Sequence, residues 1–395
     1  MKKNLDKDTL IDNRRILVNS KNADAKSFCY KFVDLFSENS LLTNQIKGKY
    51  KPDNTPLTLN DRLMEFGGKP TAMQSQLKNF FYEAVEEWTN IIDLDLHECK
   101  QEEVPKLYFS TVTYKYFLSE GAISTGVRLV LGDKNSSQVI ISENQYFEIF
   151  PAKARAVILH EIGHFLGFIH PGDGNIIFPK TYDSKLYTVM SNNPHLNNQE
   201  VSLVPKTPMF LDVTFAQEVY GANKNYNNDH TVYKFNINEP WLRTIWDGGG
   251  VDLIDLSDLN SDIKIDLREG IEHISHVTAN NSFMIAPGSN IENISTGAGN
   301  DVIKGNELDN VISPGSGKNE ITGGEGRDSF VFNNGEVGSC IINDFKSGVD
   351  KIILNGLKVI LTTITEDNTS ILLGSGYKIT LHDVVELGTA DVVHL

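Results

Sequence analysis

The segment HEIGHFLGFIH, residues 160–170, holds three histidines and one glutamate in an otherwise apolar setting. His160 and His164 are four residues apart, which on an α-helix places both rings on one face, one turn apart. Such a pair suits imidazole ligation of a tetrahedral Zn²⁺. Gly167 permits a sharp break, after which His170 can return as the third ligand. Three protein ligands leave one position open for water, so the spacing predicts one catalytic zinc ion.

Glu161 lies about 100° round the helix from His160, where its carboxylate flanks the metal without ligating it. A general base that takes a proton from water needs this position. The alternatives are a solvated helix carboxylate for Glu161 and, for the whole segment, an apolar helix that happens to contain histidine. The full pattern of histidines, glutamate and Gly167 favours the zinc interpretation over both.

The elements that must position this motif are predicted on either side of it. Pro151 suits the first turn of a helix, so residues 151–167 are expected to form a helix with the motif in its C-terminal half. Apolar residues on one face predict a core helix at 74–92, and an amphipathic helix ending at Gly221 is expected at 211–221. Alternating or β-branched runs predict strands at 94–99, 106–113, 127–131 and 137–142. Residues 46–150 are therefore expected to form a mixed α/β layer.

The C-terminal part of the chain has a different composition, rich in glycine, asparagine and aspartate from about residue 225. Between 296 and 331 the segments TGAGNDVIK, GNELDNVIS, PGSGKNEIT and GGEGRDSFV repeat every nine residues. The eighth position of each repeat is apolar: Ile303, Ile312, Ile321 and Phe330. This pattern predicts a parallel β-roll, in which each coil buries its aliphatic residues against its neighbours.

The turns of the predicted roll offer backbone carbonyls and a sixth-position side chain, the hard oxygen ligands that Ca²⁺ prefers. The sixth position is Asp301 and Asp328 in the outer repeats but Asn310 and Asn319 in the middle ones, so we expect fewer or weaker calcium sites there. Any one aspartate can instead be a simple turn former. Asp309 is a candidate to compensate from one residue earlier. The candidate calcium ligands of the repeats are Gly297, Gly299, Asp301, Asp309, Gly315, Gly317, Gly324, Gly326 and Asp328.

Composition limits the other function classes. The 395-residue chain is 40% hydrophobic with a formal net charge of -16, which disfavours a nucleic-acid partner. No apolar run approaches the roughly 18 residues of a membrane span, and no apolar stretch follows the basic N-terminus as in a secretory signal peptide. Cys29, Cys99 and Cys340 lack metal-ligand spacing and are expected to be isolated, without a disulfide framework.

The pattern H-E-x-x-H-x-x-G-x-x-H is the metzincin signature, and Pro171 after the third histidine resembles the serralysin branch of that family. The segment YTVMSNN places Met190 where the family has its Met-turn, a hydrophobic floor beneath the zinc ligands. The segments LDVTFAQEVYGAN, WDGGGVDLIDLSDL and DFKSGVDKIIL also resemble serralysin segments, so the resemblance runs from about residue 50 to the end. It implies an α+β metzincin catalytic domain followed by an all-β parallel β-roll of the RTX type.

The resemblance implies a zinc endopeptidase in which Glu161 activates the zinc-bound water, with protein or peptide substrates. It divides the chain into a leader or pro-segment at 1–45, a protease domain at 46–224 and a calcium-binding roll at 225–395. Asp247, Gly249 and Asp252 in WDGGGVD resemble a further calcium site of the family. The terminal ADVVHL resembles the uncleaved signal of type I secretion, which implies a secreted monomer whose roll folds when several structural calcium ions bind.

One departure from the family concerns turnover. Serralysins carry a tyrosine two residues after the Met-turn methionine, and here that position is Asn192. Loss of one oxyanion-type donor can lower a rate by about 10²-fold, so we expect slow turnover. Tyr187 is a candidate substitute. Two alternatives therefore stay open: a β-roll binding or toxin-type protein with a vestigial protease fold, and a protease of very narrow specificity.

Overall fold

The computed structural model describes the backbone of residues 27–32, 45–50, 56–58, 69–70, 75–103, 107–113, 127–131, 137–142, 151–173, 178–196 and 202–395. The chain divides into two compact units. The first comprises Met1–Pro194 and Val204–Asn223, and the second comprises His195–Leu203 and Lys224–Leu395. Residues 195–203, expected in the first domain, thus group with the second unit. In the described part of the chain, no helix is both long and apolar enough to span a membrane.

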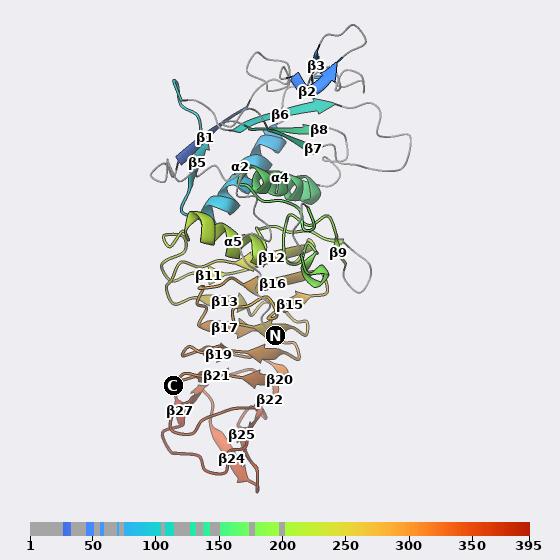
Figure 1. Cartoon of the computed structure of the whole chain (residues 1–395). Helices are drawn as coiled ribbons and strands as arrows, with labels where there is room; N and C mark the ends of the chain where they lie inside the picture. The colour runs from blue at the N-terminus through green and yellow to red at the C-terminus, as the bar shows by residue number, and fades with distance from the viewer. Residues whose placement is uncertain are drawn as a thin grey trace. The chain divides into compact units, whose positions relative to one another are not determined.

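The first unit contains a mixed sheet with the strand order β5-β1-β6-β8-β7, and β4 pairs with β6 (Figure 1). Neighbours β5-β1, β1-β6 and β6-β8 are parallel, while β7 and β4 pair antiparallel to their partners. The sheet strands are β1 (Ser27–Phe32), β4 (Lys69–Pro70), β5 (Asp95–Glu98), β6 (Leu107–Thr113), β7 (Val127–Leu131) and β8 (Ser137–Ser142). The strands predicted at 94–99, 106–113, 127–131 and 137–142 are confirmed.

β1 corrects the expectation for the N-terminal segment. Residues 27–32 were assigned to a leader, yet they pair in parallel with both β5 and β6 inside the sheet. Tyr30 packs edge-on against Phe81, with ring centroids 4.8 Å apart. The expectation of three isolated cysteines is also wrong, because Cys29 of β1 and Cys99, one residue beyond β5, form a disulfide. The strand SFCYKF is short and does not alternate between polar and apolar residues, so it had no period to detect.

Three helices accompany this sheet: α2 (Ser75–Ile91), α4 (Pro151–Phe165) and α5 (Phe210–Tyr220). α2 buries the predicted face, and its Trp88 is fully buried with the indole Nε1–H donating to the Leu159 carbonyl of α4 at 2.9 Å. α4 begins at Pro151, as predicted. We expected α5 to be amphipathic, but it is buried on most sides. It ends at Tyr220, directly before Gly221, whose φ is 83°. Short elements are β2 (Gln45–Tyr50), β3 (Pro56–Thr58) and the 3-10 helix η3 (Lys180–Tyr182).

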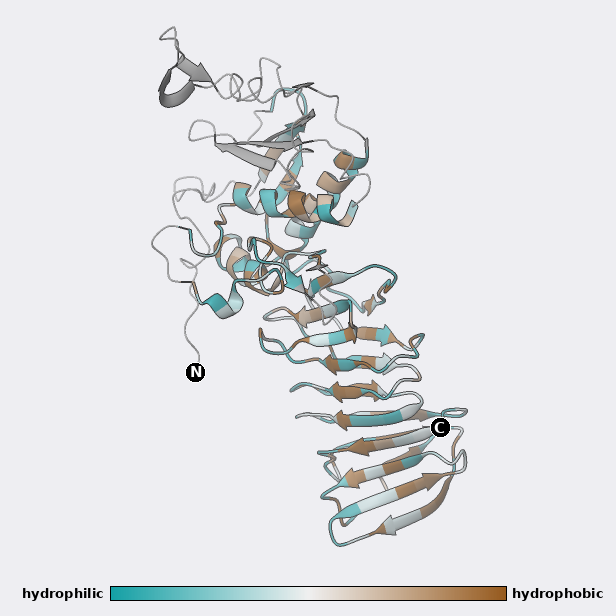
Figure 2. Cartoon of the chain, turned by 90° about the vertical axis from the view of Figure 1, so that its right-hand side faces the viewer, coloured by the Kyte–Doolittle hydropathy of each residue, from teal (hydrophilic) through white to brown (hydrophobic). Residues whose placement is uncertain are grey.

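The second unit is a roll of two sheets, and from β17 to β23 successive strands alternate between the sheets (Figure 1). Within a sheet, neighbours from consecutive coils pair in parallel with an offset of eighteen residues: Asn293 pairs with Val311, and Val302 pairs with Glu320. Two nine-residue repeats therefore make one coil. The eighth-position residues of all four repeats are fully buried in the core between the sheets. Figure 2 shows hydrophobic residues recurring in the strands of this unit, as the predicted parallel β-roll requires.

The strand bounds of the second unit follow the repeat and then continue beyond it. One sheet has the order β11-β13-β17-β19-β21-β23-β27 and the other β12-β16-β15-β14-β18-β20-β22-β26-β25-β24. A separate hairpin pairs β9 (His195–Leu196) with β10 (Ser202–Leu203). The first sheet comprises β11 (Val232–Tyr233), β13 (Leu253–Leu256), β17 (Asn293–Thr296), β19 (Val311–Ser313), β21 (Ser329–Asn333), β23 (Lys351–Asn355) and β27 (Val392–His394). The second comprises β12 (Trp241–Ile245), β14 (Lys264–Asp266), β15 (Ser275–Thr278), β16 (Asn281–Ile285), β18 (Val302–Lys304), β20 (Gly317–Thr322), β22 (Gly338–Ile342), β24 (Val359–Ile364), β25 (Asn368–Leu373) and β26 (Lys378–His382).

Candidate metal centre

The three histidines of the motif converge, and they form the one cluster of potential metal ligands among the residues that the structure describes. His160 and His164 project from α4, with ring centroids 4.6 Å apart. The chain turns sharply at Gly167, whose φ of 102° lies in the region that glycine adopts without strain. The turn brings His170 back, so that one nitrogen of each ring lies within 4.8 Å of the other two.

The Nδ1 atom of each histidine is held by an oxygen acceptor. His160 Nδ1 lies 2.8 Å from the Val189 carbonyl, and His164 Nδ1 lies 2.8 Å from the carbonyl of Phe168. His170 Nδ1 lies 3.0 Å from the Asp173 carboxylate. Since these oxygens only accept hydrogen bonds, each Nδ1 carries a proton, which leaves Nε2 as the nitrogen of each ring that can bind a metal ion. Such acceptors fix the tautomer and orientation of metal-binding histidines.

The three Nε2 atoms face one another, an arrangement that suits a cation between them. The Nε2 atoms of His160 and His164 both lie 3.2 Å from that of His170. Zinc–nitrogen bonds of about 2.0–2.1 Å in tetrahedral geometry place ligand nitrogens roughly 3.3–3.4 Å apart, close to the observed spacing. Burial, followed by the neighbouring His164, lowers the pKa of His160 to about 3, so that this ring stays neutral. The histidine triad therefore supports a zinc site.

Met190 forms the floor beneath the ligand helix. It is fully buried, and a Cβ placed on Gly163 would lie 2.6 Å from its sulfur and 3.1 Å from Cζ2 of Trp88. Glycine at position 163, between His160 and His164, therefore allows α4 to pack closely on Met190 and Trp88, and a larger residue there would displace the Met190 side chain. The sequence placed Met190 beneath the ligands through the family resemblance alone. The packing against Gly163 supplies the physical basis for that placement.

Asp212, which sequence reasoning missed, connects this floor to helix α5. It is fully buried, and its carboxylate accepts the Val189 N–H at 2.7 Å, the Met209 N–H at 2.8 Å and the Thr188 hydroxyl at 2.6 Å. Val189 in turn receives the His160 Nδ1–H on its carbonyl. Asp212 thus holds the peptide that orients one zinc ligand. Asp212 has no sequence pattern that indicates this role, because the same helix also contains the acidic Glu218.

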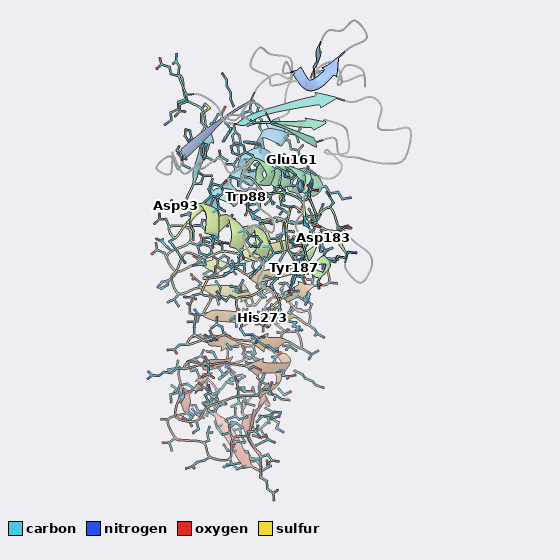
Figure 3. The ribbon with its side chains drawn as sticks, in the orientation of Figure 1. Trp88, Asp93, Glu161, Asp183, Tyr187 and His273 are labelled. Atoms are coloured by element: carbon cyan, nitrogen blue, oxygen red, sulfur yellow. A yellow bond between two sulfur atoms is a disulfide. The ribbon has the colours of Figure 1, made fainter. Side chains whose placement is uncertain are left out.

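Glu161 lies on α4 beside the triad, and Figure 3 labels it together with Trp88 of α2. Its side chain is buried, with 7% of the residue exposed. This burial raises the pKa of Glu161 to about 7. A carboxyl group that titrates near neutral pH suits a residue that both takes up and returns a proton.

Asn192 and Tyr187, the candidates for stabilising negative charge that develops during the proposed reaction, are not buried. Asn192 is exposed. Tyr187 is half-buried with its ring edge-on to Tyr182, and burial followed by Tyr182 raises its pKa. Lys185, not singled out from the sequence, is partly buried, and its charge helps to lower the pKa of His160. Burial, followed by the charge of Lys153, lowers the pKa of Lys185 itself.

In the second unit, Asp247 and Asp252 are fully buried and their carboxyl groups interact directly. Tyr233 and the Gly249 N–H donate to Asp247, whereas Oδ2 of Asp252 finds no hydrogen-bond donor among the described residues. Burial raises the pKa of both carboxyl groups. Two adjacent buried carboxylates with an unsatisfied oxygen form a donor set that suits a hard cation.

The repeats place their sixth-position side chains inside the roll. Asp301 is buried, and its Oδ2 also lacks a donor among the described residues. Asp328 is buried beside Asp350 and Asp344, and burial raises its pKa to about 6. Asp309 differs, because it is exposed and accepts the Arg327 N–H at 2.8 Å, so it does not enter a turn. The candidate glycines bring turns together: a Cβ on Gly297, Gly299, Gly315, Gly317, Gly324 or Gly326 would lie within 2.5 Å of a carbonyl oxygen of the stacked turn.

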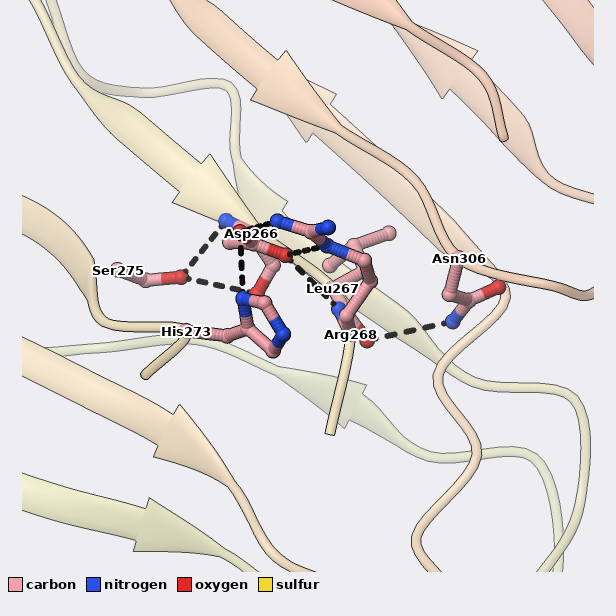
Figure 4. Close-up of polar contacts among 6 residues, drawn as sticks. All are labelled: Asp266, Leu267, Arg268, His273, Ser275 and Asn306. Carbon is pink, nitrogen blue, oxygen red and sulfur yellow. Dashed lines mark hydrogen bonds and ion pairs between the residues drawn. The ribbon is translucent and has the colours of Figure 1, made fainter. Parts of the chain in front are cut away.

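One buried carboxylate of the roll is neutralised by the chain itself. Asp266 accepts from Arg268 Nε at 2.8 Å and Nη2 at 2.6 Å, and His273 Nδ1 lies 3.3 Å away (Figure 4). The Ser275 hydroxyl accepts the N–H of Asp266 at 2.9 Å. Burial raises the pKa of Asp266, but the bonds to Arg268 outweigh burial and leave the pKa below its usual value. Asp266 therefore differs from Asp252 and Asp301, each of which has an oxygen without a hydrogen-bond donor among the described residues.

Comparison with known proteins identifies relatives of this architecture. The family model described as the C terminal of peptidase M10 serralysin matches residues 211–381. A metallopeptidase AprA of Pseudomonas marginalis is 35% identical over 185 residues, which cover 40% of this chain and 38% of that protein. A serralysin of Photorhabdus luminescens is 37% identical over 183 residues, or 40% of this chain and 37% of that protein.

A longer match extends over more of the chain. A serralysin of Photorhabdus sp. (strain Az29) is 30% identical over 253 residues, which cover 56% of this chain and 50% of that protein. The matched part is thus half or less of each relative's own length.

Proposed function

We propose that this chain, which has serralysin homologues and carries a serralysin C-terminal domain, is a secreted zinc-dependent endopeptidase that hydrolyses peptide bonds in proteins. His160, His164 and His170 hold the zinc ion. The observation that carries the proposal is the convergence of three Nε2 lone pairs, each fixed by an oxygen acceptor at Nδ1. The protease domain comprises residues 46–224 together with β1 but without residues 195–203, which group with the roll of residues 225–395.

In the proposed mechanism, a zinc ion at the triad supplies a Lewis acid that polarises the scissile carbonyl and acidifies water. Glu161 takes a proton from the attacking water and delivers it to the leaving amine. The pKa of about 7 that burial gives this carboxyl suits both steps. Val189, Phe168 and Asp173 hold the ligand rings in the tautomer that leaves each Nε2 free.

The roll serves in this proposal as a calcium-dependent folding unit for export. Buried carboxylates with unsatisfied oxygens at Asp252 and Asp301 destabilise the roll until cations bind. The disulfide between Cys29 and Cys99 supports a destination outside the cell, because disulfides persist in oxidising compartments. β27, which lies within the terminal ADVVHL, pairs with β23 in the roll, so the proposed secretion signal becomes part of the fold once calcium is available.

The peptidase assignment is tested with purified protein on a denatured, fluorescently labelled casein. We expect cleavage by the wild type and a loss of at least about 10²-fold in kcat for Glu161→Ala, with one zinc ion per chain retained in both proteins. Equal rates in the two proteins, or none in either, contradict the assignment and favour a binding protein with a vestigial protease fold. Cleavage profiles across a peptide library then distinguish a narrow from a broad specificity.

A further inference from the structure

The middle turns of the roll differ from the others in the side chain at the sixth repeat position. Asn310 and Asn319 are buried there, where the outer repeats have aspartate. The orientation of each amide follows from its neighbours. Asn310 Oδ1 accepts the Asn306 N–H at 2.9 Å, and Asn319 Oδ1 accepts the Asp301 N–H at 2.9 Å. Since only the oxygen of an amide accepts a hydrogen bond, the NH₂ group of Asn319 faces the carbonyls of its own turn, whereas that of Asn310 faces the Glu292 carbonyl of another segment.

The NH₂ group of Asn319 lies among the carbonyls of its own turn. Nδ2 is 3.0 Å from the Pro314 carbonyl, 3.5 Å from that of Gly315 and 3.4 Å from that of Ser316. It also lies 3.3 Å from the Tyr377 hydroxyl. These carbonyls are the oxygens that a calcium ion in this turn would need as ligands. A hydrogen-bond donor therefore occupies the centre of the turn.

The next position in the same ladder offers no charge to a cation. Asn319 pairs with Cys340, which is fully buried, and the Tyr377 hydroxyl donates to the Gly315 carbonyl at 3.3 Å. The sixth-position ladder on this side thus runs from Asp301 through Asn319 to Cys340, with a carboxylate at its first member alone. A calcium ion beyond Asn319 would have neutral ligands from these side chains, although high affinity depends on carboxylate charge.

In the turn that ends at Asn310, the side-chain amides of Asn306 and Asn310 both make hydrogen bonds. Asn310 Nδ2 donates to the Glu292 carbonyl at 2.9 Å and to Asn306 Oδ1 at 3.0 Å. Asn306 Nδ2 reaches the Ile291 carbonyl at 2.8 Å and that of Leu267 at 3.3 Å. The two side chains thereby connect this turn to the carbonyls of the turn beneath it. Asn306 stands at the second repeat position, where the other three repeats have glycine.

We propose that the turns ending at Asn310 and Asn319 are closed by side-chain amide groups in place of calcium ions. The inference deepens the calcium role proposed above: calcium is required where carboxylate oxygens lack donors, at Asp252 and Asp301, and is excluded where amide nitrogens satisfy the carbonyls. The middle of the roll therefore keeps its turns closed in the absence of calcium. Calcium dependence is confined to the remaining turns.

The test compares Asn319→Ala, Asn319→Asp and the exposed-turn control Asn290→Ala with the wild type, in the full-length protein. Calcium stoichiometry is measured by calorimetric titration after chelation, and melting temperature in EDTA and in millimolar calcium. Asn319→Ala is expected to bind as many calcium ions as the wild type, but to melt about 5 °C lower in both buffers because buried carbonyls lose their donors. Asn290→Ala is expected to match the wild type throughout.

Asn319→Asp places a carboxylate among the same carbonyls. We expect it to melt below Asn319→Ala in EDTA, to recover in calcium, and to bind one calcium ion more than the wild type. Loss of one calcium ion in Asn319→Ala, or an unchanged count in Asn319→Asp, overturns the inference. A wild type that binds no calcium at all contradicts the calcium role of the roll, while the lower melting temperature of Asn319→Ala in EDTA still supports amide closure.

Discussion

At the residue scale, the metal centre depends on hydrogen bonds that begin well outside the zinc motif. Asp212 accepts hydrogen bonds from Thr188, Val189 and Met209, and Val189 accepts one from His160. Outer partners of this kind typically change metal affinity by about 10- to 100-fold when they are removed. We therefore expect α5, which begins fifty residues beyond His160, to influence the zinc affinity of the triad.

Asp212→Asn tests this connection. The variant replaces the charged acceptor with a neutral amide, which weakens the hydrogen bonds from the N–H groups of Val189 and Met209, so zinc affinity is expected to fall about tenfold. Competition with a chromophoric chelator measures the affinity. Glu218→Ala, an exposed position on the same helix, is the control and is expected to bind zinc like the wild type. Equal affinity in Asp212→Asn and the control would show that the carboxylate acts on folding alone.

We expect the residue at position 192 to affect the rate of the proposed reaction. It is exposed in the segment after Met190, at the position where the resembled family has a tyrosine. We expect Asn192→Tyr to raise kcat on a peptide substrate by about tenfold, because a phenol hydroxyl can reach and stabilise developing negative charge. Asn192→Phe adds the ring without the hydroxyl and is expected to leave kcat unchanged. A similar gain in both variants would attribute the effect to the ring.

At the scale of elements, β1 enters the sheet through backbone pairing, aromatic packing and a covalent bond. It pairs with β5 and β6, Tyr30 packs on Phe81, and Cys29 bonds to Cys99 across a sequence separation of 70. A cross-link over a loop of this length stabilises a fold by roughly 2–4 kcal/mol, mainly by restricting the unfolded chain. β1 is therefore integral to the first unit.

Cys99→Ser is expected to lower the free energy of unfolding of the first unit by roughly 2–4 kcal/mol. Denaturant unfolding followed by tryptophan fluorescence reports this change, since Trp88 is buried in that unit. A thiol reductant is expected to destabilise the wild type to the same extent and to leave the variant unaffected. Insensitivity of the wild type to the reductant would contradict a stabilising disulfide.

At the scale of the whole molecule, the excess of acidic residues is partly buried in the roll. The formal net charge is -16, and Asp247, Asp252, Asp301 and Asp328 all lie inside the second unit with raised pKa values. Burial is the largest cause in each case. Without cations, the roll is therefore expected to hold protons that the unfolded chain would release.

This charge distribution predicts opposite pH dependences with and without calcium. Burial raises the pKa of Asp328 from 3.8 to about 6, so its protonation stabilises the fold fully below pH 4 and ceases to do so as the pH rises through 6. In EDTA the melting temperature of the roll is expected to fall by several degrees between about pH 4 and pH 6. In millimolar calcium it is expected to rise over the same interval, because the cation replaces the protons. Parallel curves in both buffers would exclude these carboxylates as calcium ligands.

Sequence alone was sufficient for the features that depend on local spacing. The four-residue interval between His160 and His164 predicts that both rings lie on one face of a helix. The nine-residue repeat predicts the coils of a β-roll. The structure confirms the convergence of the triad and the burial of Ile303, Ile312, Ile321 and Phe330. In both cases residues at a fixed spacing along the chain are neighbours in space, so the spacing predicts how they are arranged.

Other features needed the tertiary structure, because they join residues with no fixed separation in sequence. The disulfide of Cys29 and Cys99, the support of His160 by Asp212 through Val189, and the exposure of Asp309 all depend on how distant segments pack. The amides of Asn310 and Asn319 show the difference most clearly. Their positions followed from the repeat, but the orientation of each amide was decided by a backbone N–H group: that of Asp301, eighteen residues away, for Asn319, and that of Asn306, in the same turn, for Asn310.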